Sequence, residues 1–277
     1  MRIVTVRVDG AERWGVLDDN NRVRLGVGSL IDALGDDGAL PAPTDETVAL
    51  DTVTLLAPIP EPRRNVMCLG LNYADHAAEA SRASGKETRL PEHPVVFTKA
   101  TTAVTGPGSE ILLEPDVTEQ LDWEAELAFV IGRGGRHIQR EHALDHVFGY
   151  TIVNDLSARD IQFRHKQFFL GKSLEGACPM GPWITTADAI ADPQTLDIRC
   201  RVNGELKQHS NTSNMLFGVA EIIAVLSGIM RLLPGDVIAT GTPDGVGFAR
   251  NPPEYLRAGD EVECEIAGLG VLRNRFV

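Results

Sequence analysis

Two glutamates stand one residue apart in an otherwise apolar stretch, Trp123-Glu124-Ala125-Glu126-Leu127-Ala128-Phe129-Val130. The stretch is typical of a buried β-strand, and side chains two positions apart on a strand point to the same face. We therefore expect the two carboxylates to lie side by side. Like charges on one apolar face are unfavourable unless something compensates them, and a divalent cation would do so.

A second apolar stretch, residues 149–155, ends in a further acid, Asp155. Three carboxylates with water molecules suit the octahedral coordination of Mg²⁺ or Mn²⁺, which are hard cations that prefer oxygen ligands. The pattern therefore points to a metal site at Glu124, Glu126 and Asp155. The alternative is an exposed strand face whose acids pair with Lys or Arg, and the spacing alone leaves both interpretations open.

Short strand-like patterns dominate the chain, and helical patterns are few. Strands are predicted at residues 2–8, 13–17, 22–25, 66–69, 95–98, 111–113, 123–131, 149–153, 196–202, 237–240, 261–266 and 269–272. Helices are predicted at residues 29–34, 141–147, 157–165 and 216–230. Many strands with few helices favour a β-rich α+β fold over an alternating nucleotide-binding array.

A proline-rich stretch divides the chain near residue 60. Ala57-Pro-Ile-Pro-Glu-Pro contains three prolines and predicts a stiff connector. We expect a small N-terminal β-rich domain in residues 1–60 and the main, catalytic domain in residues 61–277. Within the main domain, residues 79–94 are polar, which is typical of a mobile lid over a site.

The overall charge narrows the classes of partner. The 277 residues include 26 Lys and Arg against 39 Asp and Glu, which gives a net charge of −13. Such acidity argues against nucleic-acid binding, which needs basic side chains to displace counterions, and against anionic membrane surfaces. The N-terminus shows no secretion signal and no C-x-x-C pair occurs, so we expect a cytoplasmic protein with reduced cysteines.

Two glycine-rich motifs are not interpreted as nucleotide sites. Gly171-Lys172-Ser173 ends like a phosphate-binding loop, but Lys166 stands where that motif requires its first glycine. Gly132-Arg-Gly134-Gly135 lacks the spacing of a dinucleotide fingerprint, and it predicts a hairpin turn after the strand at 123–131. The acidic strands thus remain the strongest chemical feature of the sequence.

At these residues the chain resembles the fumarylacetoacetate hydrolase family, with matches in family order over nearly all of residues 65–277. The matching motifs are Gly70-Leu-Asn-Tyr73-Ala-Asp-His76-Ala-Ala-Glu79, Pro94-Val-Val-Phe-Thr-Lys99, Glu124-x-Glu126, Asn154-Asp155-x-Ser-Ala-Arg159-Asp160-x-Gln162, Gly171-Lys172-Ser, Pro179-Met-Gly-Pro182 and Gly241-Thr242-Pro-Asp-Gly-Val-Gly247. The resemblance implies a mixed β-roll with a small N-terminal domain, in a homodimer.

The resemblance also implies roles for individual residues. The metal, Mg²⁺ or Mn²⁺, would be held by Glu124, Glu126 and Asp155. A His–Glu pair in the lid maps onto His76 and Glu79, and Lys172 would act with them in catalysis. The substrate pocket would be lined by Tyr73, Arg159, Gln162 and Thr242.

One position departs from the tyrosine-pathway members of the family. Those hydrolases have a further metal-ligating Asp where this chain has Asn72. A neutral amide there implies a three-carboxylate site, as in the shorter bacterial and mitochondrial members. This departure makes fumarylacetoacetate itself an unexpected substrate.

The function expected first is hydrolysis of a C–C bond in a small 2,4-diketo acid, an acylpyruvate, through a metal-stabilised enolate. His76, backed by Glu79, would deprotonate water, and Lys172 with Gln162 would stabilise the oxyanion. The same enolate chemistry also permits decarboxylation of an oxaloacetate-like acid or isomerisation of a hydroxy-diene diacid. A non-catalytic protein that binds a metal and a small acid is a further alternative.

Overall fold

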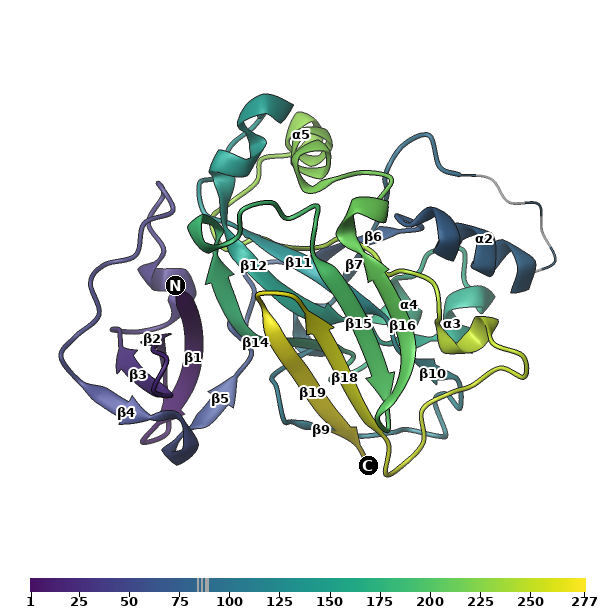
Figure 1. The fold of residues 1–277 in the computed structure, drawn as a ribbon, viewed down its shortest axis with the longest axis horizontal. Coiled ribbons are helices and arrows are strands. Elements are labelled where there is room, and N and C mark those ends of the chain that lie inside the picture. The colour runs from purple at the N-terminus through teal and green to yellow at the C-terminus, as the bar shows by residue number, and fades with distance from the viewer. Residues whose placement is uncertain (84, 86, 88–89) are drawn as a thin grey trace.

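The computed structural model describes residues 1–83, 85, 87 and 90–277, and strands make up most of its regular structure (Figure 1). The strands of the first half are β1 (Arg2–Val8), β2 (Ala11–Leu17), β3 (Arg22–Leu25), β4 (Thr47–Ala49), β5 (Thr54–Leu56), β6 (Val66–Gly70), β7 (Val95–Lys99), β8 (Val104–Thr105), β9 (Glu110–Ile111), β10 (Leu121–Asp122) and β11 (Ala125–Ile131). Those of the second half are β12 (Val147–Asn154), β13 (Ser157–Ala158), β14 (Cys178–Thr186), β15 (Asp197–Val202), β16 (Glu205–Asn211), β17 (Val237–Ala239), β18 (Glu261–Ile266) and β19 (Gly270–Phe276). The α-helices are α1 (Leu30–Ala33), α2 (Ala74–Ala83), α3 (Arg159–Arg164), α4 (Phe169–Lys172) and α5 (Val219–Ile229).

Two large sheets organise these strands. The twelve-stranded sheet follows the order β4-β3-β2-β1-β14-β12-β11-β17-β6-β7, with β5 paired to β1 and β8 to β14. The five-stranded sheet has the order β16-β15-β18-β19-β9, and β10 pairs with β13. Parallel pairs occur alongside antiparallel ones, as between β6 and β17. The predicted β-rich α+β class is confirmed.

Strand β11 lies at the centre of the molecule, and all of its residues are buried. Leu127, Phe129 and Ile131 pack into the hydrophobic cluster that includes the five-stranded sheet and α5. Ala128 and Val130 belong to a second cluster on the opposite face. Because side chains alternate along a strand, Glu126 shares the face of Ala128 and Val130.

The N-terminal strands lie together at one side of the molecule (Figure 1). They have a hydrophobic cluster of their own, formed by Val4, Val6, Leu17, Val23 and Leu25. They also join the large sheet, because Arg2 and Ile3 of β1 pair with β14. The division of the chain at residue 60 stays a prediction.

Several local predictions differ from the structure. Strand β14 was not expected, because its two prolines and its glycine interrupt a strand pattern. Helix α2 lies where the polar lid segment was expected to begin, while residues 84, 86, 88 and 89 of that segment lie outside the described residues. Residues 132–135 do not form a tight hairpin turn, since a longer connection with the 3-10 helix Arg140–His146 joins β11 to β12.

Among the helices of the described residues, none is long and apolar enough to cross a membrane. The longest apolar helix, α5, has 11 residues and buries one side in the main cluster. A membrane span needs about 20 apolar residues.

Candidate metal centre and active site

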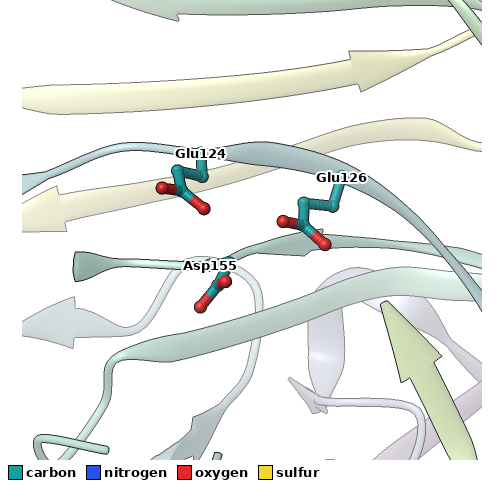
Figure 2. A group of neighbouring side chains, drawn as sticks. All are labelled: Glu124, Glu126 and Asp155. Atoms are coloured by element: carbon teal, nitrogen blue, oxygen red, sulfur yellow. The ribbon is translucent and has the colours of Figure 1, made fainter. Parts of the chain in front are cut away.

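Glu124, Glu126 and Asp155 meet in the interior of the protein. Figure 2 shows the side chains of Glu126, on β11, and of Glu124, directly before β11, pointing to the same side, toward the aspartate. Each contributes one oxygen to a group whose members all lie within 4.8 Å of one another, and all three residues are buried. The predicted clustering of the three carboxylates is therefore present in the structure.

Strand register brings Asp155 to the glutamates. In the antiparallel pair of β11 and β12, Ala125 lies opposite Asn154, so the next residues outward, Glu124 and Asp155, also face each other. The Asp155 amide donates to the Glu124 carbonyl at 2.8 Å, and the Asn154 side chain accepts from the Glu124 amide at 3.0 Å. These bonds fix the ends of both strands where the side chains converge.

Three buried cations surround the carboxylates. Lys172 Nζ lies 2.7 Å from Glu124 and 2.6 Å from Asp155, and Arg159 Nη1 lies 2.7 Å from the other Glu124 oxygen. Lys99, which is fully buried, donates to Asp155 at 2.5 Å and to the carbonyl of Leu156 at 3.0 Å. Burial alone would raise the pKa of Glu124, but Lys172 and Arg159 outweigh it and lower that pKa.

Glu126 is the carboxylate that these cations leave uncompensated. One of its oxygens accepts from the Gly241 amide at 2.8 Å, but among the described side chains it makes no ion pair. Burial and the neighbouring charges of Asp155 and Glu124 raise its pKa well above the usual value. A divalent cation would relieve this repulsion, so the donor set fits a hard metal ion bound by oxygen.

Replacing Lys99 with methionine should destabilise the protein, because Asp155 would lose one of its two buried cationic partners. Breaking a buried ion pair in this way costs about 3 kcal/mol. Urea unfolding in EDTA would measure the change in the free energy of unfolding. A variant as stable as the wild type would show that Lys172 alone compensates Asp155.

Helix α2 carries the predicted His–Glu pair to the site. His76 is 7% exposed, and its Nδ1 lies 3.5 Å from a carboxylate oxygen of Glu79. Glu79 also accepts from the Gly245 amide, at 3.0 and 3.1 Å to its two oxygens. The loop after β17 thus anchors Glu79, and Glu79 in turn faces one nitrogen of the imidazole.

A cavity of about 80 Å³ is lined by Glu124, one of the three carboxylates, and by residues of helix α2. Its volume accommodates only a few water-sized groups, which suits a small molecule. Its lining combines charged and polar side chains with four phenylalanines. The lining residues are Leu69, Gly70, Leu71, His76, Ala80, Phe97, Glu124, Arg159, Gln162, Phe163, Phe168, Lys172, Thr242 and Phe248.

The other predicted pocket residues are placed differently. Gln162 lines the cavity and accepts from Arg159 Nη1 at 3.0 Å, and Thr242 lines it while donating to the Ala125 carbonyl at 2.9 Å. Tyr73 is buried outside the lining residues, and its hydroxyl has no hydrogen-bond partner among the residues that the structure describes. Burial and the charge of Glu126 raise the pKa of Tyr73.

Asn72 has a structural role in this chain. Its side-chain oxygen accepts from the Phe217 amide at 2.9 Å, and its nitrogen donates to the carbonyls of Phe217 and Thr240 at 3.0 and 2.7 Å. Both ends of the amide are thus occupied by the backbone. This arrangement agrees with the expected three-carboxylate set.

Two buried charged residues of the site had no predicted role. Lys99 holds Asp155, and Asp122 holds Arg159 through a contact of 2.8 Å between Oδ2 and Nε. Lys99 closes one of the family-matching motifs, which was its only signal, whereas Asp122 stands between Leu121 and Trp123 with no pattern that marks it. The contacts themselves join residues 56 and 37 positions apart.

Sequence and structure comparisons place the chain among known proteins. A sequence model described as the C-terminal part of fumarylacetoacetate (FAA) hydrolase matches residues 65–277, and one described as Rv2993c-like, N-terminal, matches residues 1–58. The chain is 51% identical over 228 residues to the oxaloacetate tautomerase YisK of Bacillus subtilis, covering 82% of this chain and 74% of that protein.

Two solved structures resemble the whole chain. A fumarylacetoacetate hydrolase from psychrophilic Exiguobacterium antarcticum superposes with a TM-score of 0.87 at 43% identity, covering 100% of this chain and 99% of that one. A 2-hydroxyhepta-2,4-diene-1,7-dioate isomerase from Mycobacterium marinum gives 0.82 at 34% identity, covering 100% and 98%. Because the family model spans more than half of the residues and includes every carboxylate of the acidic cluster, this chain belongs to the fumarylacetoacetate hydrolase family.

Proposed function

We propose that this protein catalyses keto–enol tautomerisation of a small 2-oxo diacid of the oxaloacetate type. The observation that carries the proposal is the His76–Glu79 pair, because His76 lines the same cavity as the cations Lys172 and Arg159. Proton abstraction next to a carbonyl requires a base, and it is favoured by cations that stabilise the negative charge on the carbonyl oxygen. The name of the Bacillus subtilis relative, an oxaloacetate tautomerase, supports the same reaction.

We further propose that Glu124, Glu126 and Asp155 hold Mg²⁺ or Mn²⁺. The uncompensated charge of Glu126 and the all-oxygen donor set support this assignment. When bound, such an ion supplies Lewis-acid stabilisation of negative charge on the oxygens of a 2-oxo acid.

The proton transfer is assigned to His76. With Nδ1 facing Glu79, the Nε2 nitrogen is the one available to take a proton from the carbon next to the keto group. The electron pair of that C–H bond forms the C=C bond, and the carbonyl oxygen becomes negatively charged beside Lys172 and Arg159. Return of the proton to this oxygen yields the enol, so no atom is gained or lost.

The walls of the cavity also favour a reaction in which water is not a reactant. Phe97, Phe163, Phe168 and Phe248 line it, and apolar walls limit the number of water molecules beside the reacting atoms. Acylpyruvate hydrolysis, which the sequence analysis placed first, consumes a water molecule. It is therefore less well supported than tautomerisation, both by these walls and by the names of the relatives.

Proton exchange in D₂O tests the proposal directly. With Mg²⁺, the protein should accelerate exchange of the C3 protons of oxaloacetate above the rate in the same buffer without protein, and EDTA should abolish the acceleration. Proton NMR follows the exchange, and the same spectra would show pyruvate if decarboxylation were the reaction. An exchange rate equal to the protein-free rate would refute the tautomerase assignment.

A second candidate is isomerisation of a hydroxy-diene diacid, which moves a proton between two carbons. The 34% identical solved structure of a 2-hydroxyhepta-2,4-diene-1,7-dioate isomerase favours it, and the same histidine would serve as the base. Parallel assays with a hydroxy-diene diacid and with acetylpyruvate would rank the three reactions by kcat/KM. Acetate released from acetylpyruvate would indicate hydrolysis.

A further inference from the structure

Asp122 is a fully buried carboxylate that lies outside the lining of the cavity yet contacts two parts of its wall. Its Oδ1 accepts from the amides of Trp123 at 2.8 Å and Gly247 at 2.7 Å. Its Oδ2 accepts from the Phe248 amide at 3.0 Å and from Arg159 Nε at 2.8 Å. One side chain thus satisfies four donors from three segments of the chain.

The contact with Arg159 sets the direction of the guanidinium group. With Nε fixed by Asp122, Nη1 reaches Glu124, and the group lies 4.5 Å above the Phe248 ring. The remaining nitrogen, Nη2, is buried and has no hydrogen-bond partner in the described structure. A buried donor without a partner is unfavourable, so a ligand oxygen in the cavity is the natural acceptor for it.

The contacts with Gly247 and Phe248 fix the loop that also anchors helix α2. Two residues before Gly247, the Gly245 amide binds Glu79 of α2. Position 247 requires glycine, because a Cβ there would lie 2.2 Å from the Glu254 carbonyl and 2.7 Å from Asp122 Oδ1. The amides of this loop therefore bind two carboxylates, Glu79 from helix α2 and Asp122 from β10.

We propose that Asp122 is a positioning residue that couples the two halves of the site. It orients the guanidinium group of Arg159, which lines the cavity. It also fixes the loop at residues 245–248, which binds Glu79 of helix α2. The ligand class, a small acid with adjacent oxygen donors, rests on the proposed function. The coupling itself rests only on the four contacts of Asp122 and on the Glu79–Gly245 contact.

Asp122→Asn tests this coupling in the full-length protein. Asparagine has the same shape, but its amide nitrogen cannot accept from either pair of donors, so Arg159 or the loop must lose its partner. With saturating Mg²⁺, we expect the Kd for oxalate, a probe with adjacent oxygen donors, to rise by about tenfold or more. Mg²⁺ affinity without oxalate should change by less than about threefold, because Asp122 contacts none of the three carboxylates.

Hydrogen exchange provides a readout that does not depend on turnover. In Asp122→Asn the amides of peptides covering residues 245–248 should exchange faster than in the wild type, including Gly245, whose own acceptor is intact. The matched control is Asp160→Asn, which removes a nearby acid that binds the Thr118 hydroxyl and the Ile161 amide. This control should match the wild type in both measurements.

Three results would overturn the proposal. These are wild-type oxalate affinity in Asp122→Asn, unchanged hydrogen exchange at residues 245–248, or an equal loss of Mg²⁺ and oxalate affinity, which would indicate that the whole site is disrupted.

A measurement on the wild type tests the coupling if the variant does not fold. Oxalate with Mg²⁺ should slow hydrogen exchange at Gly245, Gly247 and Phe248 together. Slowing confined to Gly245 would refute the coupling. Oxalate binding needs no turnover, so the coupling can hold even if the protein does not tautomerise oxaloacetate.

Discussion

Glu126→Gln is expected to weaken Mg²⁺ binding by at least about a hundredfold, since even changes beside a metal ligand cost about 10–100-fold. Glutamine keeps an oxygen for the Gly241 amide, which now binds Glu126 at 2.8 Å, so the backbone around the site should not change. What the variant loses is a negative charge and one ligand oxygen of the acidic cluster. Metal-dependent proton exchange on oxaloacetate should fall with the affinity.

The same substitution should make the metal-free protein more stable, which is an unusual direction for a change at a buried site. Because the folded protein raises the pKa of Glu126, it holds that proton more tightly than the unfolded chain does. The resulting stability is present at low pH and is lost as the pH rises from the ordinary glutamate value toward the raised one. Glutamine never ionises, so the variant avoids this loss at neutral pH.

Calorimetric titration with Mg²⁺ and thermal unfolding in EDTA at pH 8 measure the two effects. Glu265→Gln is a suitable control, because Glu265 pairs with Arg201 on the five-stranded sheet, away from the cluster. Lower Mg²⁺ affinity together with a higher Tm in EDTA would support a site in which a bound metal ion compensates the negative charge of Glu126. Unchanged affinity would remove Glu126 from the ligand set.

The sequence predicted the acidic cluster because its geometry is almost entirely local. Alternation along one strand sets Glu124 and Glu126 on one face. Asp155 ends the next strand of the large sheet along the chain, and the antiparallel register brings it opposite Glu124. A contact between successive strands requires little knowledge of the remaining fold, so residue spacing predicted that the three carboxylates could meet, whereas the family resemblance was needed to favour a metal site over an exposed, ion-paired strand face.

Residue spacing could not predict the charged residues that support the cluster and its arginine, Lys99 and Asp122. Lys99 comes from β7 at one edge of the large sheet, and Asp122 comes from the separate pair of β10 and β13. Their contacts depend on how distant segments pack, which periodicity does not encode. Strand β14 was missed for a related reason, because its pairing with β1 and β12 overrides the poor strand propensity of its prolines.

The choice of reaction was the least predictable part of the function. The same base, cations and carboxylates suit hydrolysis, decarboxylation and isomerisation, because all three pass through an enolate. The residues together with the family resemblance therefore placed acylpyruvate hydrolysis first, whereas the names of the relatives favour tautomerisation. The predicted homodimer and cytoplasmic location stay predictions.

His76→Ala is expected to lower kcat for oxaloacetate tautomerisation by about 10²–10⁴-fold, the usual contribution of a positioned general base. Among the described residues, His76 on α2 forms its ion-pair contact with Glu79 and with none of the three carboxylates, so Mg²⁺ affinity should fall much less than kcat. Losing the ring should not unfold α2 either, because Glu79 still accepts from the Gly245 amide. NMR exchange rates and calorimetric Mg²⁺ titration separate the two effects.

Glu79→Gln sharpens the assignment, because glutamine can still accept from Gly245 but no longer supplies a negative charge beside the imidazole. Because the Glu79 carboxylate lies 3.5 Å from Nδ1 of His76, the loss of its charge should lower kcat, but by less than the loss of the ring in His76→Ala. A kcat in His76→Ala within about threefold of the wild type would show that another group moves the proton. Lys172, which also lines the cavity, would then be the residue to test.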